Sequence, residues 1–295
     1  MSAGSALPGA TEPMHFWPGF SGVRLAGDAW GDPQRPLVLL QHGRGQTRHA
    51  WKATGRILGR AGYHAVAFDA RGHGDSDWAP DGLYAQDAMV EDLKCIVAAI
   101  GGRCAALVGA SMGGGTSLVA IGEKHVDVAA LVVVDTAPRI EPAGVDRIRA
   151  FMTQKPEGFD SLEEVADAIS RYQPHRRRPA SLEGLAKNVR RMPNGKYRWH
   201  WDPRIRENQI DFVQRQEQLA ACARSLTIPT LLVRGGLSDV LSEEGARDFL
   251  ELCPHSEYVN VTSAAHMVAG DRNDKFAGAV VEFLSRVAPP VTPFI

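Results

Sequence analysis

The sequence contains no long run of apolar residues. None of its apolar stretches approaches the roughly 20 consecutive residues that a helix needs to cross a bilayer. The first 13 residues, MSAGSALPGATEP, also lack the basic start and the apolar centre of a secretory signal peptide. These two absences predict a cytoplasmic protein that does not insert into a membrane.

Cysteine and one-sided charge are also scarce. The four cysteines are far apart and form no C-x-x-C pair, so we expect reduced thiols and neither a disulfide nor a zinc site. There is no H-E-x-x-H motif and no phosphate-binding G-x-x-x-x-G-K loop, and we expect no metal and no cofactor. The formal net charge of -1 gives no basic field for nucleic acid. The expected partner is a small-molecule substrate, and the oligomeric state stays open.

Short, continuously apolar runs alternate with segments of helical periodicity along most of the chain. Such runs are typical of parallel strands covered on both faces, and the alternation predicts a doubly wound, mostly parallel α/β sheet. The expected strands span residues 36–41, 63–69, 104–110, 128–135, 228–234 and 256–261, after a hairpin strand near residues 22–30. The expected helices lie within residues 49–62, 87–101, 243–253 and 273–287.

One segment interrupts this alternation. Residues 138–215 show no clear buried strand and contain 16 Lys or Arg residues against 11 Asp or Glu residues. We interpret the segment as a helical cap inserted into an α/β core that consists of residues 14–137 and 216–288. Residues 1–13 and 289–295 are expected to be loose termini.

The segment CAALVGASMGGGTSLVAIG places a single serine between an apolar strand and an apolar helix. Gly109-Ala110-Ser111-Met112-Gly113 is a G-x-S-x-G sequence, and its position between strand and helix predicts a nucleophile elbow. Side chains two residues before and after the serine would clash in so sharp a turn, which explains both glycines. The turn exposes the Ser111 hydroxyl at the carboxyl edge of the sheet.

A serine hydroxyl needs a base, and the base needs an acid that orients it. His266 follows the last expected strand and is the candidate base. Asp239 follows the strand before it and is the favoured acid, which gives the order serine, acid, histidine. Asp135, at the end of LVVVD, is the rival for the acid.

An oxyanion hole is the third requirement of acyl transfer. The Gly-rich stretch that begins with His42 and Gly43 follows an early strand, as such a loop requires. The two expected donors are the backbone N–H groups of Arg44 and Met112.

With these pieces the chain resembles the α/β-hydrolase superfamily, in the cap-bearing group of esterases, carbon–carbon hydrolases, epoxide hydrolases and cofactor-free haloperoxidases. The matching features are His42-Gly43, the DARGHGDSD loop of residues 69–77, the elbow, Asp239 and His266. The resemblance implies the α/β-hydrolase fold and the same three catalytic residues. Arg44 departs from the pattern, because relatives with HGGGQT carry glycine there.

A serine at the elbow favours acyl transfer, since epoxide hydrolases and haloalkane dehalogenases of this fold carry aspartate there. Hydrolysis of carboxylic esters (EC 3.1.1-type) is the leading interpretation. Lactone or thioester hydrolysis uses the same machinery, and carbon–carbon bond hydrolysis is a further enzyme alternative. A non-catalytic ligand-binding homologue is the alternative outside catalysis.

The cap is expected to choose the substrate. We hypothesise that a cap arginine, or Arg44, faces the pocket and pairs with a substrate carboxylate such as that of a monoalkyl phthalate. For the triplet of residues 176–178, a solvated basic turn is the favoured interpretation. The expected substrate-binding residues are Gly43, Arg44, Met112, Trp201 and Met267.

Overall fold

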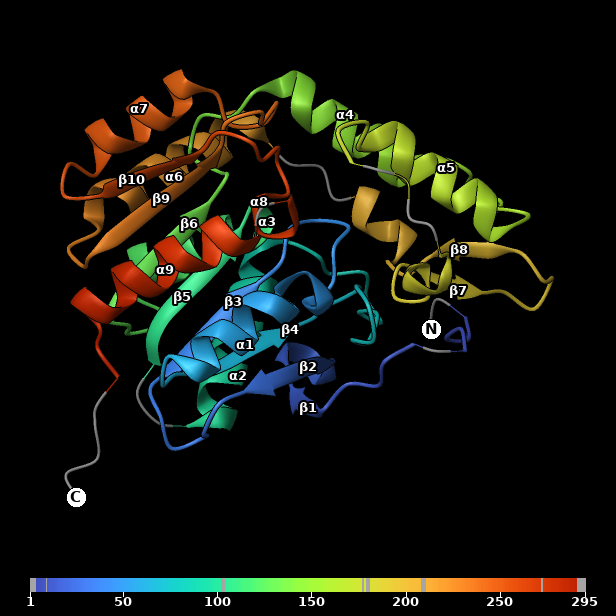
Figure 1. Cartoon of the computed structure of the whole chain (residues 1–295), viewed down its shortest axis with the longest axis horizontal. Helices are drawn as coiled ribbons and strands as arrows, with labels where there is room; N and C mark the ends of the chain where they lie inside the picture. The colour runs from blue at the N-terminus through green and yellow to red at the C-terminus, as the bar shows by residue number, and fades with distance from the viewer. Residues whose placement is uncertain are drawn as a thin grey trace.

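The structure, a computed structural model, describes residues 4–8, 10–101, 104–176, 178, 181–207, 211–271 and 273–290. At its centre is an eight-stranded sheet with the strand order β1-β2-β4-β3-β5-β6-β9-β10 (Figure 1). The first two strands run antiparallel to their neighbours, and the other six are parallel to one another. The strands are β1 (His15–Pro18), β2 (Arg24–Trp30), β3 (Leu37–Gln41), β4 (His64–Phe68), β5 (Cys104–Ala110), β6 (Ala130–Val134), β9 (Thr230–Gly235) and β10 (Glu257–Val261).

The six parallel strands lie where the continuous apolar runs predict them. All residues of β3, β4, β6 and β9 are buried, as expected for strands covered on both faces. The edge strand β10 is mostly accessible, because it has a neighbour on one side only. The prediction of a doubly wound α/β sheet is confirmed.

Helices cover both faces of the sheet (Figure 1). On one face, Leu58 of α1 (Lys52–Arg60) and Phe276 of α9 (Asn273–Val287) pack against alternate strand residues such as Val38. The other face is covered by α2 (Gln86–Ile100), α3 (Met112–Gly122), α6 (Phe212–Ser225) and α7 (Glu243–Leu252). A short helix, α8 (Val268–Asp271), precedes α9. In the described part of the chain, no helix is long and apolar enough to cross a membrane.

Between β6 and α6 the chain forms a separate group of elements at one end of the sheet (Figure 1). These are α4 (Pro142–Thr153), α5 (Leu162–Tyr172), the strands β7 (Val189–Arg191) and β8 (Tyr197–Trp199), and the 3-10 turns η3 (Glu183–Leu185) and η4 (Pro203–Glu207). The prediction of a helical cap is therefore incomplete in one respect, because the cap also contains an antiparallel hairpin formed by β7 and β8. The alternating pattern YRWHW was the signal for it. The boundaries at residues 138 and 215 stay a prediction.

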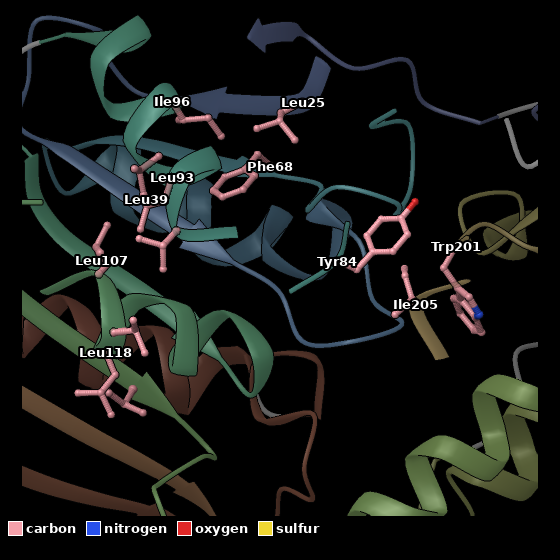
Figure 2. Close-up of a cluster of buried hydrophobic side chains, with 14 of the residues drawn as sticks. Leu25, Leu39, Phe68, Tyr84, Leu93, Ile96, Leu107, Leu118, Trp201 and Ile205 are labelled. Carbon is pink, nitrogen blue, oxygen red and sulfur yellow. The ribbon is translucent and has the colours of Figure 1, made fainter. Parts of the chain in front are cut away.

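The cap and the sheet share one hydrophobic cluster. Figure 2 shows Leu107 and Leu118 at one end of this cluster and Tyr84, Trp201 and Ile205 at the other. The Tyr84 hydroxyl donates a hydrogen bond of 2.5 Å to Asp202, which lies next to Trp201 in the cap. Because these residues are buried together, the cap is fixed against the core at this point.

The start of the described chain is less loose than expected. Ser5 and Arg191 of β7 exchange two backbone hydrogen bonds of 3.0 and 2.9 Å. Arg48 Nη2 donates to the Thr11 carbonyl at 3.0 Å. The expectation of a loose N-terminus is wrong for these residues, whereas residues 1–3, 9 and 291–295 lie outside the described part.

Candidate active site

The turn between β5 and α3 has the geometry of a nucleophile elbow. Ser111 adopts φ 49° and ψ -111°, a strained conformation for a non-glycine residue. A Cβ atom on Gly109 would lie 2.4 Å from the Gly113 carbonyl oxygen. A Cβ atom on Gly113 would lie 2.5 Å from the carbonyl oxygen of Gln41 in β3. Both glycines of the motif are therefore required by close backbone approach, as the sequence predicts.

The acid that contacts His266 is Asp135. His266 Nδ1 lies 2.7 Å from Asp135 Oδ2, and the Asp135 side chain is completely buried. A nitrogen at this distance from a carboxylate carries the proton, so Nδ1 donates and Nε2 is left as the acceptor. The favoured assignment of Asp239 is contradicted by this geometry, and the rival assignment of Asp135 fits it.

Asp239 points away from the histidine. Its carboxylate forms an ion pair of 3.0 Å with Arg147 of α4, and its side chain is 33% exposed. The sequence could not separate the two acids, because β6 and β9 are adjacent parallel strands that end at the same edge of the sheet. The loop after β9 turns Ser238 toward Asp135 instead of Asp239.

Asp135 is held by three hydrogen bonds. Besides the bond to His266, Oδ1 accepts from the Gly235 N–H at 2.8 Å and Oδ2 accepts from the Ser238 hydroxyl at 2.5 Å. The Ser238 hydroxyl accepts in turn from the backbone N–H groups of Val240 and Leu241 at 3.1 and 3.2 Å. These bonds fix the orientation of the Asp135 carboxylate toward His266. Sequence reasoning gave no role to Ser238.

Short contacts tie Ser111 to the acid and to the Gly-rich loop. The Ser111 N–H donates at 2.9 Å to the carbonyl of Val134, the residue before Asp135. On the other side, a Cβ atom on Gly43 would lie 3.3 Å from the Ser111 Cβ. The structure thus brings the nucleophile, the acid and the Gly-rich loop to one place.

Two histidines fix the Gly-rich loop that follows β3. His42 Nδ1 donates to the Gly43 carbonyl at 2.8 Å, and its Nε2 accepts from the Ala70 N–H at 2.9 Å. His73 Nε2 accepts from the Gly45 N–H at 3.2 Å. Both histidines therefore act through structural hydrogen bonds to the loop. Within the described residues the Arg44 N–H has no acceptor, so it is free to bind a ligand.

Met112 supplies the second free donor. It is the first residue of α3, and the first N–H groups of a helix have no partner within the helix. This N–H points from the positive end of the helix dipole, which favours a developing negative charge. Met112 directly follows Ser111 and Arg44 follows Gly43, while the oxyanion hole that their N–H groups would form stays a prediction.

His200 of the cap joins the two loop histidines. Its ring centroid lies 6.0 Å from that of His73, which lies 5.2 Å from that of His42. His200 Nδ1 accepts from the Gly74 N–H at 2.7 Å. Burial lowers the pKa of all three imidazoles, and their mutual repulsion lowers those of His73 and His200 further. The three rings are therefore neutral acceptors or donors at neutral pH.

A cavity of about 590 Å³ lies between the core and the cap. Its lining includes Arg44, Trp201, His266 and Met267, and three of these are predicted substrate-binding residues. Met112 borders a different, small interior space, and Gly43 contacts Ser111. The cavity is large enough for a drug-sized molecule and opens onto the histidine of the candidate triad.

The Arg44 side chain is an unpaired charge in this lining. No carboxylate of the described chain forms an ion pair with it, and burial and the nearby Arg149 lower the pKa of its guanidinium. Of the basic triplet, Arg178 is a half-exposed partner of Asp167, whereas Arg176 lines the cavity. The solvated-turn interpretation is wrong for Arg176, and Arg177 lies outside the described residues.

A family profile described as serine aminopeptidase, S33, matches residues 32–273, which is most of the chain. The chain belongs to this α/β-hydrolase family. Its elbow, histidine and cap are positioned on the fold that the family shares, as the resemblance in the sequence implied.

Proteins of known name resemble this hydrolase-family chain over most of its length. Esterase Rv0045c of Mycobacterium tuberculosis is 29% identical over 82% of this chain and 80% of its own, and its crystal structure superposes with a TM-score of 0.71 at 26% identity over 94% and 93%. A 3-hydroxybutyrate-oligomer hydrolase of Cupriavidus necator is 27% identical over 82% and 87%. An α/β hydrolase of Novosphingobium aromaticivorans gives a TM-score of 0.75 at 25% identity over 92% and 98%.

Replacing Gly109 by alanine is expected to destabilise the protein, because the added methyl group meets the Gly113 carbonyl. Gly278, exposed on α9, is the matched control, since nothing lies within 4 Å of its added Cβ. We expect Gly109→Ala to lower the free energy of unfolding by about 2 kcal/mol or more. Gly278→Ala should raise it by roughly 0.5–1 kcal/mol. Urea denaturation measures both, and equal effects would contradict the close approach.

The stability of the protein should fall below about pH 6.5, the ordinary pKa of histidine. His42, His73 and His200 stay neutral in the folded chain and become protonated in the unfolded chain, so the unfolded state binds more protons there. Between pH 7.5 and 5.5 a histidine that stays neutral in the folded chain costs at most about 1.4 kcal/mol. His200→Gln keeps an acceptor for Gly74 and should remove the part of this loss that comes from His200. Urea denaturation at both pH values measures it, and a loss unchanged by the substitution would contradict the assignment.

Proposed function

We propose that the protein is a carboxylic ester hydrolase with Ser111 as nucleophile, His266 as general base and Asp135 as the acid that orients it. The observation that carries the proposal is the 2.7 Å contact between His266 Nδ1 and the buried Asp135 carboxylate, next to a strained serine elbow. This contact leaves His266 Nε2 free to accept the serine proton.

The proposed reaction is acyl transfer through an acyl-enzyme. Ser111 Oγ attacks the ester carbonyl carbon while His266 Nε2 takes the hydroxyl proton. The carbonyl oxygen becomes an oxyanion and accepts hydrogen bonds from the Arg44 and Met112 backbone N–H groups. The C–O bond to the alcohol breaks, and His266 returns the proton to the departing oxygen. Water then attacks the acyl-enzyme by the same steps and releases the acid and Ser111.

The named relatives support ester cleavage over other acyl transfers. One is called an esterase, one a 3-hydroxybutyrate-oligomer hydrolase, and a mouse relative that is 26% identical over 86% of this chain is called an sn-1-specific diacylglycerol lipase. Each of these names describes the cleavage of an ester bond. We extend that chemistry, and no particular substrate, to this chain.

A free carboxylate on the ester is the finer part of the proposal. Arg44 lines the cavity without an anionic partner, and its planar guanidinium binds a carboxylate through two parallel hydrogen bonds. The described lining residues include no Asp or Glu that would repel such a group. A monoester of a dicarboxylic acid, such as a monoalkyl phthalate, has the required charge.

Ser111→Ala and Asp135→Asn are both expected to abolish most hydrolysis of p-nitrophenyl butyrate. Loss of the nucleophile costs on the order of 10⁶ in turnover, and loss of the acid about 10⁴, because the imidazole takes the wrong tautomer. Asp239→Asn is the matched control and should change kcat less than about threefold, since Asp239 pairs with Arg147 at the surface. Release of p-nitrophenol measures all three. A large loss in Asp239→Asn with a small loss in Asp135→Asn would overturn the triad assignment.

Arg44→Gln should lower the preference for a monoalkyl phthalate over p-nitrophenyl butyrate by roughly 10- to 100-fold in the ratio of kcat/KM values. The substitution removes the guanidinium and keeps the backbone N–H. The free acid is quantified for both esters in the same preparations. A ratio that does not change would remove Arg44 from substrate recognition and leave the triad proposal intact.

A further inference from the structure

The outer part of the cavity carries a second group of positive charges. Lys52, Arg56, Arg176 and Lys187 all line it, and we call them the outer basic cluster. We propose that this cluster is an anion-binding subsite for a carboxylate or phosphate at the end of the substrate that lies away from the ester bond. The inference rests on the proposed ester hydrolysis in one respect, because it assigns the bound anion to the substrate. Binding to the subsite itself is measurable without turnover.

The cluster bridges the core and the cap. Lys52 and Arg56 lie four residues apart on α1, so their side chains project from the same face of the core helix. Lys187 follows η3 in the cap, and Arg176 follows α5. All four side chains line the same cavity, and burial, Arg176 and Lys52 lower the pKa of the Lys187 ammonium group.

No protein carboxylate compensates three of these charges. Lys52, Arg56 and Lys187 are exposed at the rim of the cavity, and in the part of the chain that the structure describes they take part in no ion pair and no side-chain hydrogen bond. Some exposed cations elsewhere do have a carboxylate partner, as Lys196 has Asp160 and Arg286 has Glu257. Like charges that face one another without a counter-charge raise the local potential and attract an anion.

Arg176 is held in place as a donor. Its Nε lies 2.5 Å from Asp271, and Asp271 also accepts from the Ala265 N–H at 2.9 Å, next to His266. The Arg176 Nη2 atom is buried and has no hydrogen-bond partner. It lies 2.7 Å from the position of a Cβ on Gly270, which lines the cavity. The side chain as a whole is 33% exposed and paired with Asp271, so the buried Nη2 is the part of the guanidinium that lacks an acceptor and points to a ligand.

The cluster is distinct from Arg44. Arg44 follows β3 in the Gly-rich loop, whereas Lys52 and Arg56 lie on α1 and Arg176 and Lys187 lie in the cap. Apolar side chains of Phe151, Trp199 and Trp201 also line the cavity. The substrate class that fits is an ester with an apolar middle and an oxyanion at its far end.

Binding of monomethyl adipate and of neutral dimethyl adipate to Ser111→Ala tests the subsite by calorimetry, since neither ester turns over. The two ligands differ by one carboxylate. We expect the monoester to bind at least tenfold more tightly, and Lys187→Met or Lys52→Met in the Ser111→Ala background to remove most of this preference. Lys187→Arg should retain it. Lys94→Met, on α2 and paired with Glu91, is the control that should leave it unchanged.

Several results would overturn the subsite. They are an equal affinity for the two esters, a preference that survives both lysine substitutions, or a preference that Arg44→Gln removes and Lys187→Met does not. If Lys94→Met reduced the preference for the monoester as much as Lys187→Met does, the preference would come from the overall positive charge of the protein and not from a binding site. A matched methyl ester with a terminal phosphonate distinguishes a carboxylate ligand from a phosphate ligand. The anion that the subsite prefers is the one whose binding is weakened most by Lys187→Met. The proposed hydrolysis is tested separately by the wild-type protein, which would cleave no ester if that proposal were wrong.

Discussion

The hydrogen bond between His266 and the buried Asp135 carboxylate is the constraint on which the rest of the site depends. It fixes the imidazole tautomer, and a neutral imidazole with a free Nε2 is what a serine nucleophile requires. The carboxylate is held by Gly235 and Ser238 from the next strand, so the parallel pairing of β6 with β9 is part of the same arrangement. The strained backbone of Ser111 is held by that sheet edge as well, through its bond to Val134.

Electrostatics divide the site into neutral and charged parts. Two buried neutral histidines, His42 and His73, hold the Gly-rich loop, and His200 binds the Gly74 N–H beside them. Within the described residues the Arg44 N–H has no acceptor. The cavity beyond has positive side chains and, among its described lining residues, no carboxylate. The same protein therefore offers backbone donors to a charge that develops during reaction and side-chain cations to a charge that the substrate already carries.

Much of this arrangement was predictable from the sequence, because it follows from local patterns. The six parallel strands, the elbow and the histidine after β10 each depend on a short segment with its own signal. The identity of the acid could not be predicted from a local segment. Asp135 and Asp239 follow neighbouring strands, and only the turn of the loop after β9 decides between them. The β7–β8 hairpin is too short for its pattern to be decisive, and the pairing of Ser5 with Arg191 joins distant segments. Lys52 and Lys187 meet only through the packing of the cap on α1.

The Nδ1 proton of His266 gives the most direct test of the account. In a proton NMR spectrum of the wild-type protein we expect a strongly deshielded imidazole resonance from the short bond to Asp135. The resonance should persist in Asp239→Asn and disappear or move far upfield in Asp135→Asn. Its loss in Asp239→Asn, or its persistence unchanged in Asp135→Asn, would contradict the claim that Asp135 orients the catalytic histidine.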